Sequence, residues 1–390
     1  MNSPPKHILP LLVISQFAGT SLWFTGNALL PELKASIGLS QYALSYVTAA
    51  VMTGFITGTL VFAFLSLADR YSPARLFFVC CIIGALLNVG IAWFATDAVS
   101  LFLLRFFTGF CIAGIYPVGM KIAADWYEKG LGKALGYLLG ALVLGTSFPH
   151  LLRDRNLELP WRQVLFCTSL FAGIGGCLML FFVGDGPHRK KTGGFKWNAL
   201  QIVFKSLKWR KAAVGYFGHM WELYTFWGFL PLMIALYAER NNISPNVSLI
   251  SFLAIASGFI GCVIGGYIAL KIGSAPVAKI AIFISGLCCL VSPFLFDLSW
   301  PFFVVAIFIW GFTVIPDSPQ FSTLVAAYSP PELRGTALTI YNSIGFTVTT
   351  LSLILMDFVF HSDGILGGKN AFIILLPGPI AGLIAMRRLK

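Results

Sequence analysis

The sequence predicts an all-α membrane protein of twelve transmembrane helices, arranged as two six-helix pseudo-repeats with cytoplasmic N and C termini. Three observations predict this fold class. Hydrophobic residues make up 57% of the 390 residues and charged residues only 11%, whereas ordinary soluble domains carry about 25% charge. The apolar residues are gathered in segments long enough to cross a bilayer. A strongly basic stretch divides the chain near its midpoint.

The twelve predicted spans follow from the length of each apolar segment. A helix needs about 20 apolar residues to cross the hydrocarbon core. Helices are predicted rather than strands because a helix satisfies its backbone hydrogen bonds internally in lipid. The spans of the first half are 8–29, 43–67, 76–96, 98–122, 131–151 and 162–184. Those of the second half are 212–236, 247–270, 276–296, 301–325, 335–358 and 370–387.

The basic stretch between the halves covers residues 185–211. Such an excess of Lys and Arg between apolar blocks is typical of a cytoplasmic connection, so the predicted domains are residues 1–184, the linker 185–211, and residues 212–390. Within the linker, residues 195–209 fit a short helix on the inner membrane surface or a solvated segment, and both interpretations stay open. The basic residues of the linker are Arg189, Lys190, Lys191, Lys196, Lys205, Lys208, Arg210 and Lys211.

The positive charge of the chain has a sided distribution. The net charge is +12, but the basic residues lie in short loops between apolar segments, which argues against a nucleic-acid partner and suits anionic lipid headgroups. With both termini inside, twenty of the 27 Lys and Arg residues fall on the inner face and six on the outer face. This excess predicts a multi-pass protein of the cell inner membrane with cytoplasmic termini.

The two halves show traces of an internal repeat. Gly-Lys-Ala-Leu at 132–135 opens the fifth span, and Gly-Thr-Ala-Leu at 335–338 opens the eleventh span 203 positions later. Together with six spans in each half, this match indicates two parallel repeats. Small residues four positions apart, which allow close helix packing, occur at Gly54, Gly58, Gly136 and Gly140.

The loop after the second span carries a family motif. Residues 65–75 read Leu-Ser-Leu-Ala-Asp-Arg-Tyr-Ser-Pro-Ala-Arg, which resembles the G-x-L-A-D-R-x-G-R-R loop of the major facilitator superfamily. Both motif glycines are replaced, whereas Asp69, Arg70 and Arg75 are kept. The resemblance implies that these three residues act in gating, with Asp69 near a helix N-terminus and paired to a basic residue. A solvated ion pair in a turn is the alternative.

Further resemblance runs along the whole chain. Residues 101–109 are similar to the L-x-x-x-R-x-x-x-G motif of the family's fourth helix, whose arginine, here Arg105, is associated with substrate or proton coupling. Ala141 stands where drug antiporters of the family have a proline, which disfavours that group. Residues 316–321 and 331–338 look like a bacterial branch loosely similar to nitrate/nitrite and cyanate permeases, but the glycine-rich signature of nitrate porters is absent. Nitrate is therefore not predicted as the substrate.

The intramembrane polar residues form the candidate site. Charge inside a bilayer costs about 2.5–3.5 kcal/mol at the helix centre, so it usually faces a cavity or a partner. In the fold that this sequence resembles, helices 1, 4, 7 and 10 line the central cavity. Structural roles remain the alternatives: an interhelical brace for the arginine, a structural pair with an Arg, Trp or backbone group for the glutamate, a hydrogen-bonded side chain for the histidine, and a helix cap for the aspartate. The candidates on these four spans are Gln16, Asn27, Arg105, His219, Glu222, Asp317 and Gln320.

These features predict a secondary active transporter that moves a small polar or anionic solute by alternating access, coupled to protons. A carboxylate and a histidine one turn apart, Glu222 and His219, are suitable proton carriers. A proton-driven exporter of an amphipathic or siderophore-like compound is the alternative, and a non-transporting sensor is a third. Motifs for ATP binding, metal-dependent proteolysis or a serine nucleophile are absent. We expect no enzyme activity, cofactor or metal, and a monomer whose partners are solute, protons and lipids.

Overall fold

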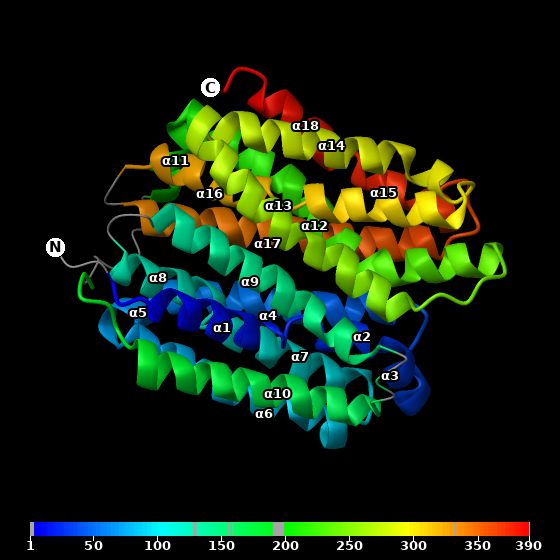
Figure 1. The fold of residues 1–390 in the computed structure, drawn as a ribbon, viewed down its shortest axis with the longest axis horizontal. Helices are drawn as coiled ribbons and strands as arrows, with labels where there is room; N and C mark the ends of the chain where they lie inside the picture. Colours follow the sequence, from blue (N-terminus) through cyan, green and yellow to red (C-terminus); the bar gives the residue numbers. More distant parts are fainter. Residues whose placement is uncertain are drawn as a thin grey trace. The chain divides into compact units, whose positions relative to one another are not determined.

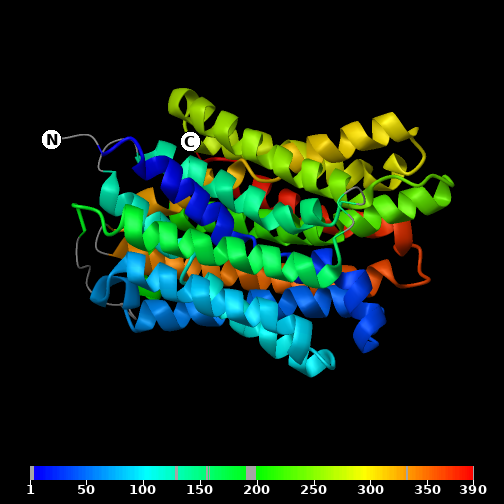
Figure 2. The ribbon, with the colours of Figure 1, turned by 60° about the horizontal axis from the view of Figure 1, so that its bottom comes forward.

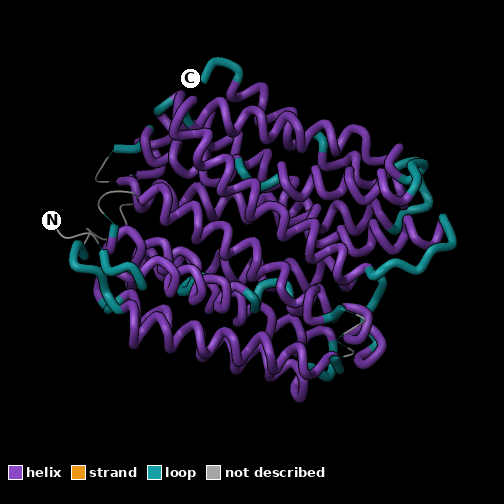
Figure 3. Tube along the Cα trace, in the orientation of Figure 1, coloured by secondary structure: helices purple, strands orange, loops and turns teal. Residues whose placement is uncertain are grey.

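The structure is a computed structural model that describes residues 4–127, 131–154, 157, 159–189, 199–330 and 333–389. Over these ranges the chain is helical and contains no strand (Figure 3). It forms two compact units. The first unit contains Met1–Ser40 and Ala50–Phe195, and the second contains Gln41–Ala49 and Lys196–Lys390. Each unit is described by itself below.

The first unit is a bundle of long apolar helices interrupted by short ones (Figure 1). Its helices α6 and α10 lie side by side, as both Figure 1 and Figure 2 show. A π-helical turn at Met179–Val183 follows α10. The helices are α1 (Ile8–Thr20), α2 (Thr25–Ala28), α3 (Leu30–Ile37), α4 (Ala43–Phe64, which begins in the second unit), α5 (Leu67–Arg70), α6 (Pro73–Phe94), α7 (Ala98–Ile112), α8 (Tyr116–Trp126), α9 (Leu131–Leu152) and α10 (Trp161–Leu178).

The second unit is organised around its longest helix, α12, which packs against α16, α17 and α18. A 3₁₀ helix at Gly368–Leu375 leads into α18. The helices are α11 (Ala199–Lys205), α12 (Leu207–Arg240), α13 (Val247–Ile272), α14 (Ser274–Leu295), α15 (Trp300–Thr313), α16 (Asp317–Ala327), α17 (Arg334–Phe360) and α18 (Pro377–Met386).

All twelve predicted spans fall on helical structure, which confirms the predicted fold class. Among the described residues, ten helices or helix pairs are long and apolar enough to cross a membrane. The first span is shorter because α1 ends at Thr20. The seventh, α12, starts at Leu207 rather than at the predicted 212, inside the predicted linker. Of that linker, residues 190–198 lie outside the described residues, including Lys190, Lys191 and Lys196, so the predicted surface helix is described only as α11.

Breaks interrupt the first, fourth and tenth predicted spans, of which only the tenth was expected to be broken, by Pro316 and Pro319. The first stops at Thr20 and resumes as α2 at Thr25, the fourth is interrupted at 113–115, and the tenth is interrupted at 314–316. Proline explains the last two breaks because it lacks a backbone N–H and clashes with the preceding turn. Pro117 removes the bond to the carbonyl at 113, and Pro316 and Pro319 do the same for the tenth span. The breaks of the fourth and tenth spans occupy equivalent places in the two halves, whereas the seventh span, α12, has no break that corresponds to the one after Thr20.

Close helix contacts support the predicted repeat. A Cβ on Gly109 of α7 would lie 2.0 Å from the backbone oxygen of Val51 on α4, so only glycine allows this approach. In the second unit, Gly311 of α15 makes the same contact with the oxygen of Ala254 on α13. These positions are separated by 202 and 203 residues, in agreement with the offset found in the sequence. Gly136, however, has no neighbouring atom within 4 Å of its Cβ position.

Candidate functional site

Glu222 of α12 lies in a fully hydrogen-bonded site inside the second unit. Its Oε1 accepts from the indole N–H of Trp310 at 2.7 Å and from the thiol of Cys289 at 3.3 Å, and its Oε2 accepts from the hydroxyl of Ser285 at 3.0 Å. The Glu222 side chain is buried. Ser285 and Cys289 come from α14 and Trp310 from α15, so three neutral donors on two helices surround one carboxylate. We call these four residues the Glu222 site.

His219 and Asp317 form a second buried pair next to the Glu222 site. Nδ1 of His219 lies 2.8 Å from Oδ1 of Asp317, and both side chains are buried. Asp317 is the first residue of α16, directly after the break in the tenth span. Rings of Tyr216 and Phe321 flank the imidazole, with centroids 5.8 and 6.2 Å away. Nε2 of His219 has no hydrogen-bond partner among the described residues.

Arg105 of α7 stabilises the break after α1. Its guanidinium donates to the backbone oxygen of Leu22 at 3.1 Å and to the backbone oxygen of Trp23. These carbonyls belong to the turn between α1 and α2, where regular helical hydrogen bonds are lost. Arg105 is completely buried, and only its Nε lacks a hydrogen-bond partner among the described residues. In this structure the side chain therefore acts as a brace between α7 and the broken first span.

The remaining predicted site residues are buried but belong to different units. Gln16 of α1 and Asn27 of α2 lie in the first unit, and Gln320 of α16 lies one turn after Asp317 in the second. Both amide atoms of Gln16 lack a hydrogen-bond partner among the described residues. A Cβ on Gly119 would lie 2.1 Å from its Oε1, so the glycine makes room for this amide.

Other polar side chains of the first unit resemble Gln16 in this respect, and two of them lie on α9. The hydroxyl of Thr146 and Nε2 of His150, both on α9, are buried and have no hydrogen-bond partner among the described residues. Helix α9 packs directly against α1 through Gly145, whose Cβ position is 2.2 Å from the hydroxyl oxygen of Thr20. Buried polar groups without partners are rare in proteins and usually await water or a ligand.

The loop after the second span, residues 65–75, which the charge distribution predicts to lie on the inner face and which we call the inner-face loop, places its charges differently from the family motif. Asp69 of α5 forms an ion pair with Lys121 of α8, with 2.8 Å between Oδ1 and Nζ. Arg70 and Arg75 are exposed and make no ion pair within the ranges that the structure describes. Instead Arg189 reaches this loop and donates to the backbone oxygens of Asp69 and Tyr71 at 3.3 and 2.5 Å.

Asp185 joins this loop to the start of α6. Its Oδ1 accepts from the hydroxyl of Ser72 at 2.8 Å and from the N–H of Ala74 at 3.0 Å, which satisfies a donor at the helix N-terminus. Its Oδ2 lies 2.9 Å from Nη1 of Arg189. The predicted position of a carboxylate near a helix N-terminus is thus occupied by Asp185 at α6, while Asp69 pairs with Lys121.

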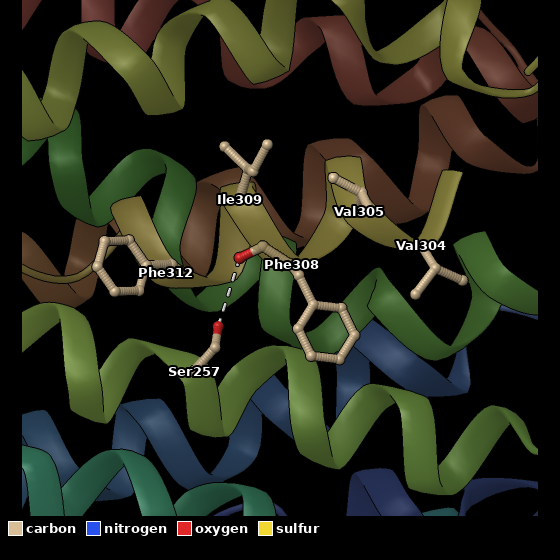
Figure 4. A pocket seen from close by; sticks show the side chains of 6 residues that line it. All are labelled: Ser257, Val304, Val305, Phe308, Ile309 and Phe312. Atoms are coloured by element: carbon tan, nitrogen blue, oxygen red, sulfur yellow. Dashed lines mark hydrogen bonds between the residues drawn. The ribbon is translucent and has the colours of Figure 1, made fainter. Parts of the chain in front are cut away.

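A large apolar pocket lies apart from the buried ionisable groups (Figure 4). It has a volume of about 460 Å³ between α13 and α15. The hydroxyl of Ser257 donates to the backbone oxygen of Ala254 at 2.6 Å and lies 3.4 Å from the backbone oxygen of Phe308, the contact that the dashed line in Figure 4 marks. A pocket of this kind offers nothing to a polar solute. Its lining residues are Ser257, Val304, Val305, Phe308, Ile309 and Phe312.

Several partners of the site residues were not predicted from the sequence. Nothing in the sequence marks the three partners of Glu222 as a site, apart from the i, i+4 spacing of Ser285 and Cys289, which puts these two residues on one face of α14. Asp185 and Arg189 also have this spacing, and it indicates an ion pair if the segment is helical or turned. His150 stood out only as a polar residue near the end of a span.

The fold and these buried polar groups define a class of protein: a multi-pass helical membrane transporter. The family model of the Major Facilitator Superfamily matches residues 11–352. The chain therefore belongs to the Major Facilitator Superfamily, a family of transporters rather than of enzymes.

Relatives by sequence are transporters of different solutes. A probable galactarate/D-glucarate transporter of Pseudomonas putida is 23% identical over 410 aligned positions, which cover 91% of this chain and 86% of that protein. Organic cation transporter 1 of Caenorhabditis elegans is 28% identical over 152 positions, which cover 38% of this chain and 25% of that protein.

Solved structures confirm the fold. The human organic anion transporter MFSD10 superposes with a TM-score of 0.71 at 14% identity, over 100% of both chains. The nucleoside transporter NupG superposes with a TM-score of 0.73 at 15% identity, over 98% of this chain and 100% of that one. At this level of identity, the two likenesses describe the fold alone.

Proposed function

We propose that this protein is a proton-coupled secondary transporter of a small polar or anionic solute in the cell inner membrane. The observation that carries the proposal is the burial of Glu222, His219 and Asp317 beside a break in a membrane span of a family member. Intramembrane acids and histidines are costly and typically mark proton relays or substrate paths. Broken helices at such positions are a common feature of transporter binding sites.

The solute class that we propose is a hydroxylated organic acid. Several buried polar groups of the first unit have no hydrogen-bond partner among the described residues, among them the amide of Gln16, the hydroxyl of Thr146 and Nε2 of His150. Amide and hydroxyl groups suit the hydroxyls of a sugar acid, and an imidazole or guanidinium suits its carboxylate. One relative, whose alignment covers 91% of this chain, is named for galactarate and D-glucarate, which are hydroxylated dicarboxylates.

The topology that we propose follows the charge distribution. Residues 1–184 and 212–390 form the two halves, and the basic residues 185–211 form a cytoplasmic linker. Both termini are cytoplasmic, as the excess of basic residues on one side requires. Anionic lipids contact the basic inner face, and the transporter works as a monomer.

Counterflow in proteoliposomes tests the solute class. The purified protein is reconstituted, loaded with unlabelled galactarate or D-glucarate, and diluted into a trace of the labelled acid. We expect uptake that exceeds uptake by protein-free liposomes and that increases when the outside is made more acidic. Counterflow of tetraethylammonium or a nucleoside instead of the acids would show that the proposed solute class is wrong.

A matched pair of variants locates the solute site. Gln16→Ala removes a buried amide that has no hydrogen-bond partner in the described part of the chain, whereas Asn88→Ala removes a buried amide whose Nδ2 donates to Thr168 and Ser169. We expect the Gln16 variant to raise the half-saturating concentration of the acid while its thermal stability is kept. The Asn88 variant should lose stability instead. Normal affinity in the Gln16 variant would remove that residue from the site.

A further inference from the structure

The Glu222 site has an arrangement that suits two protonation states. Its three donors are neutral, and no Lys, Arg or His forms an ion pair with Glu222 within the described part of the chain. An ionised carboxylate without a nearby cation is expensive to bury, even when it is hydrogen-bonded. A glutamate with a purely structural role would be expected to have a charged partner. Reversible protonation of the carboxylate therefore explains better why Glu222 is buried among neutral donors.

From this geometry, and resting on the proposed proton-coupled transport, we propose that Glu222 binds the coupled proton and that the hydroxyl of Ser285 adapts the site to it. The Ser285 hydroxyl has two acceptors within reach: Oε2 of Glu222 at 3.0 Å and the backbone oxygen of Ile282 at 3.3 Å. When Glu222 is ionised, Ser285 donates to Oε2. When a proton binds, an O–H bond forms on Oε2 and donates to Oγ of Ser285, whose own hydrogen turns to Ile282.

No buried group loses its hydrogen bond in this exchange. Trp310 and Cys289 donate to Oε1 in both states, so only one hydroxyl rotates. The step adds one proton to the carboxylate and moves no electron pair to any other group. Because a buried polar group that loses its hydrogen bond destabilises the protein, a site that stays satisfied in both states is suited to reversible binding.

The other titratable groups near Glu222 are arranged differently. Asp317 and His219 face it from α16 and α12, and Cys288 and Cys289 face it from α14. Oδ1 of Asp317 lies 2.8 Å from Nδ1 of His219, and a carboxylate beside an imidazole can share the charge of an ion pair, which Glu222 cannot do with its neutral donors. We therefore assign the His219–Asp317 pair a positioning role and the proton to Glu222.

Proton binding at Glu222 changes how α15 is held to α12. The Trp310 N–H donates to a charged acceptor before protonation and to a neutral one afterwards, and hydrogen bonds to charged acceptors are shorter and about twice as strong. Trp310 precedes the break at 314–316 by one turn. The proton therefore loosens the segment that ends at this break.

Infrared difference spectroscopy of the full-length protein in nanodiscs tests the assignment without any substrate. Acidification should produce the C=O stretching band of a buried protonated carboxyl group. Glu222→Gln should abolish this band. Ser285→Ala should keep it but shift it, because the acid loses its acceptor. Glu239→Gln, a change of an exposed glutamate at the end of α12, should leave it unchanged.

Two outcomes would overturn the assignment. The first is a band that survives in Glu222→Gln, and the second is a band that disappears in Asp317→Asn instead. Thermal unfolding of each variant shows whether it is folded, and the frequency shift in Ser285→Ala provides a second readout if the Glu222 variant is not. In proteoliposomes, pH-driven accumulation should fall at least tenfold in Glu222→Gln while counterflow continues. Absence of counterflow in the unmodified protein would refute the proposed function but leave the infrared result intact.

Discussion

His219 and Glu222 lie one turn apart on α12 and contact opposite sides of the break in the tenth span. Glu222 accepts a hydrogen bond from Trp310, which precedes the break, and His219 contacts Asp317, which follows it. A single turn of one helix thus holds both segments of an interrupted neighbour. The angle between α15 and α16 therefore depends on two contacts that each include an ionisable group.

The contact after the break can be tested with Asp317. Asp317→Ala removes the carboxylate whose Oδ1 lies 2.8 Å from Nδ1 of His219, and loss of the polar neighbour of a buried group costs about 1–3 kcal/mol. We expect a lower Tm than that of the unmodified protein in the same detergent. Asp317→Asn retains an oxygen at the same position and is the matched control, for which we expect a smaller loss. Equal stability of all three proteins would show that the pair contributes nothing to holding α16.

Arg105 has a structural role in this conformation that makes a clear prediction. Arg105→Ala leaves the backbone oxygens of Leu22 and Trp23 unsatisfied in the interior, at about 1–3 kcal/mol each. We expect a marked fall in Tm and faster proteolysis between α1 and α2. Arg105→Lys keeps the charge but cannot bond both carbonyls in the planar geometry of a guanidinium, so we expect an intermediate Tm.

Measurements of solute affinity in the same Arg105 variants separate bracing from binding. If the arginine only braces the turn, the fraction that remains folded should bind the solute with normal affinity. Lost affinity at unchanged Tm would instead assign Arg105 to the solute site.

The repeated glycine contacts predict two equivalent substitutions. In Gly109→Ala and Gly311→Ala, the new Cβ would lie 2.0 Å from the oxygen of Val51 or Ala254, so the helices must move apart. Overpacking of this kind costs about 1–3 kcal/mol and occasionally more. We expect both variants to lose stability and folded yield to a similar degree. Gly136→Ala, with no neighbour within 4 Å, should be neutral or slightly stabilising because alanine favours helix.

The sequence predicted the layout of the fold because that layout depends on features that can be counted. Length and hydropathy give the twelve spans, and the offset of 203 positions between similar segments gives the repeat that Gly109 and Gly311 confirm. The breaks were only partly visible. The prolines at 316 and 319 indicated one of them. No proline accompanies the break after Thr20, where the backbone oxygens of Leu22 and Trp23 accept hydrogen bonds from Arg105 of another helix.

The site was predicted less completely because contacts depend on helix rotation. The sequence singles out Glu222, His219 and Asp317 as costly in lipid, and the structure brings them close together. The sequence alone does not show that Glu222 faces Ser285 of α14. A helix that is buried on all sides has no amphipathic pattern, so its rotation cannot be read from the sequence. Polar partners of this kind have ordinary residue types, so they become apparent only in three dimensions.

The ion pair of the inner-face loop predicts an effect on rate rather than on stability. Asp69 and Lys121 are about one-fifth exposed, and ion pairs near the surface contribute about 0–1 kcal/mol. We therefore expect Asp69→Asn and Lys121→Gln to keep the Tm of the unmodified protein. Each should slow solute uptake in proteoliposomes several-fold, with solute binding unchanged, if this pair stabilises one conformation of the transport cycle. Uptake rate and equilibrium binding are the two measurements required.

Controls for the inner-face pair come from the same loop. Arg70→Gln removes an exposed charge that makes no ion pair within the described ranges, so uptake should stay normal. The double variant Asp69→Asn/Lys121→Gln should take up solute no more slowly than either single variant, because each single substitution already removes the same ion pair. Additive slowing would mean that Asp69 and Lys121 act through separate partners. Arg189 is then the residue to change next, since it donates to the backbone oxygens of Asp69 and Tyr71.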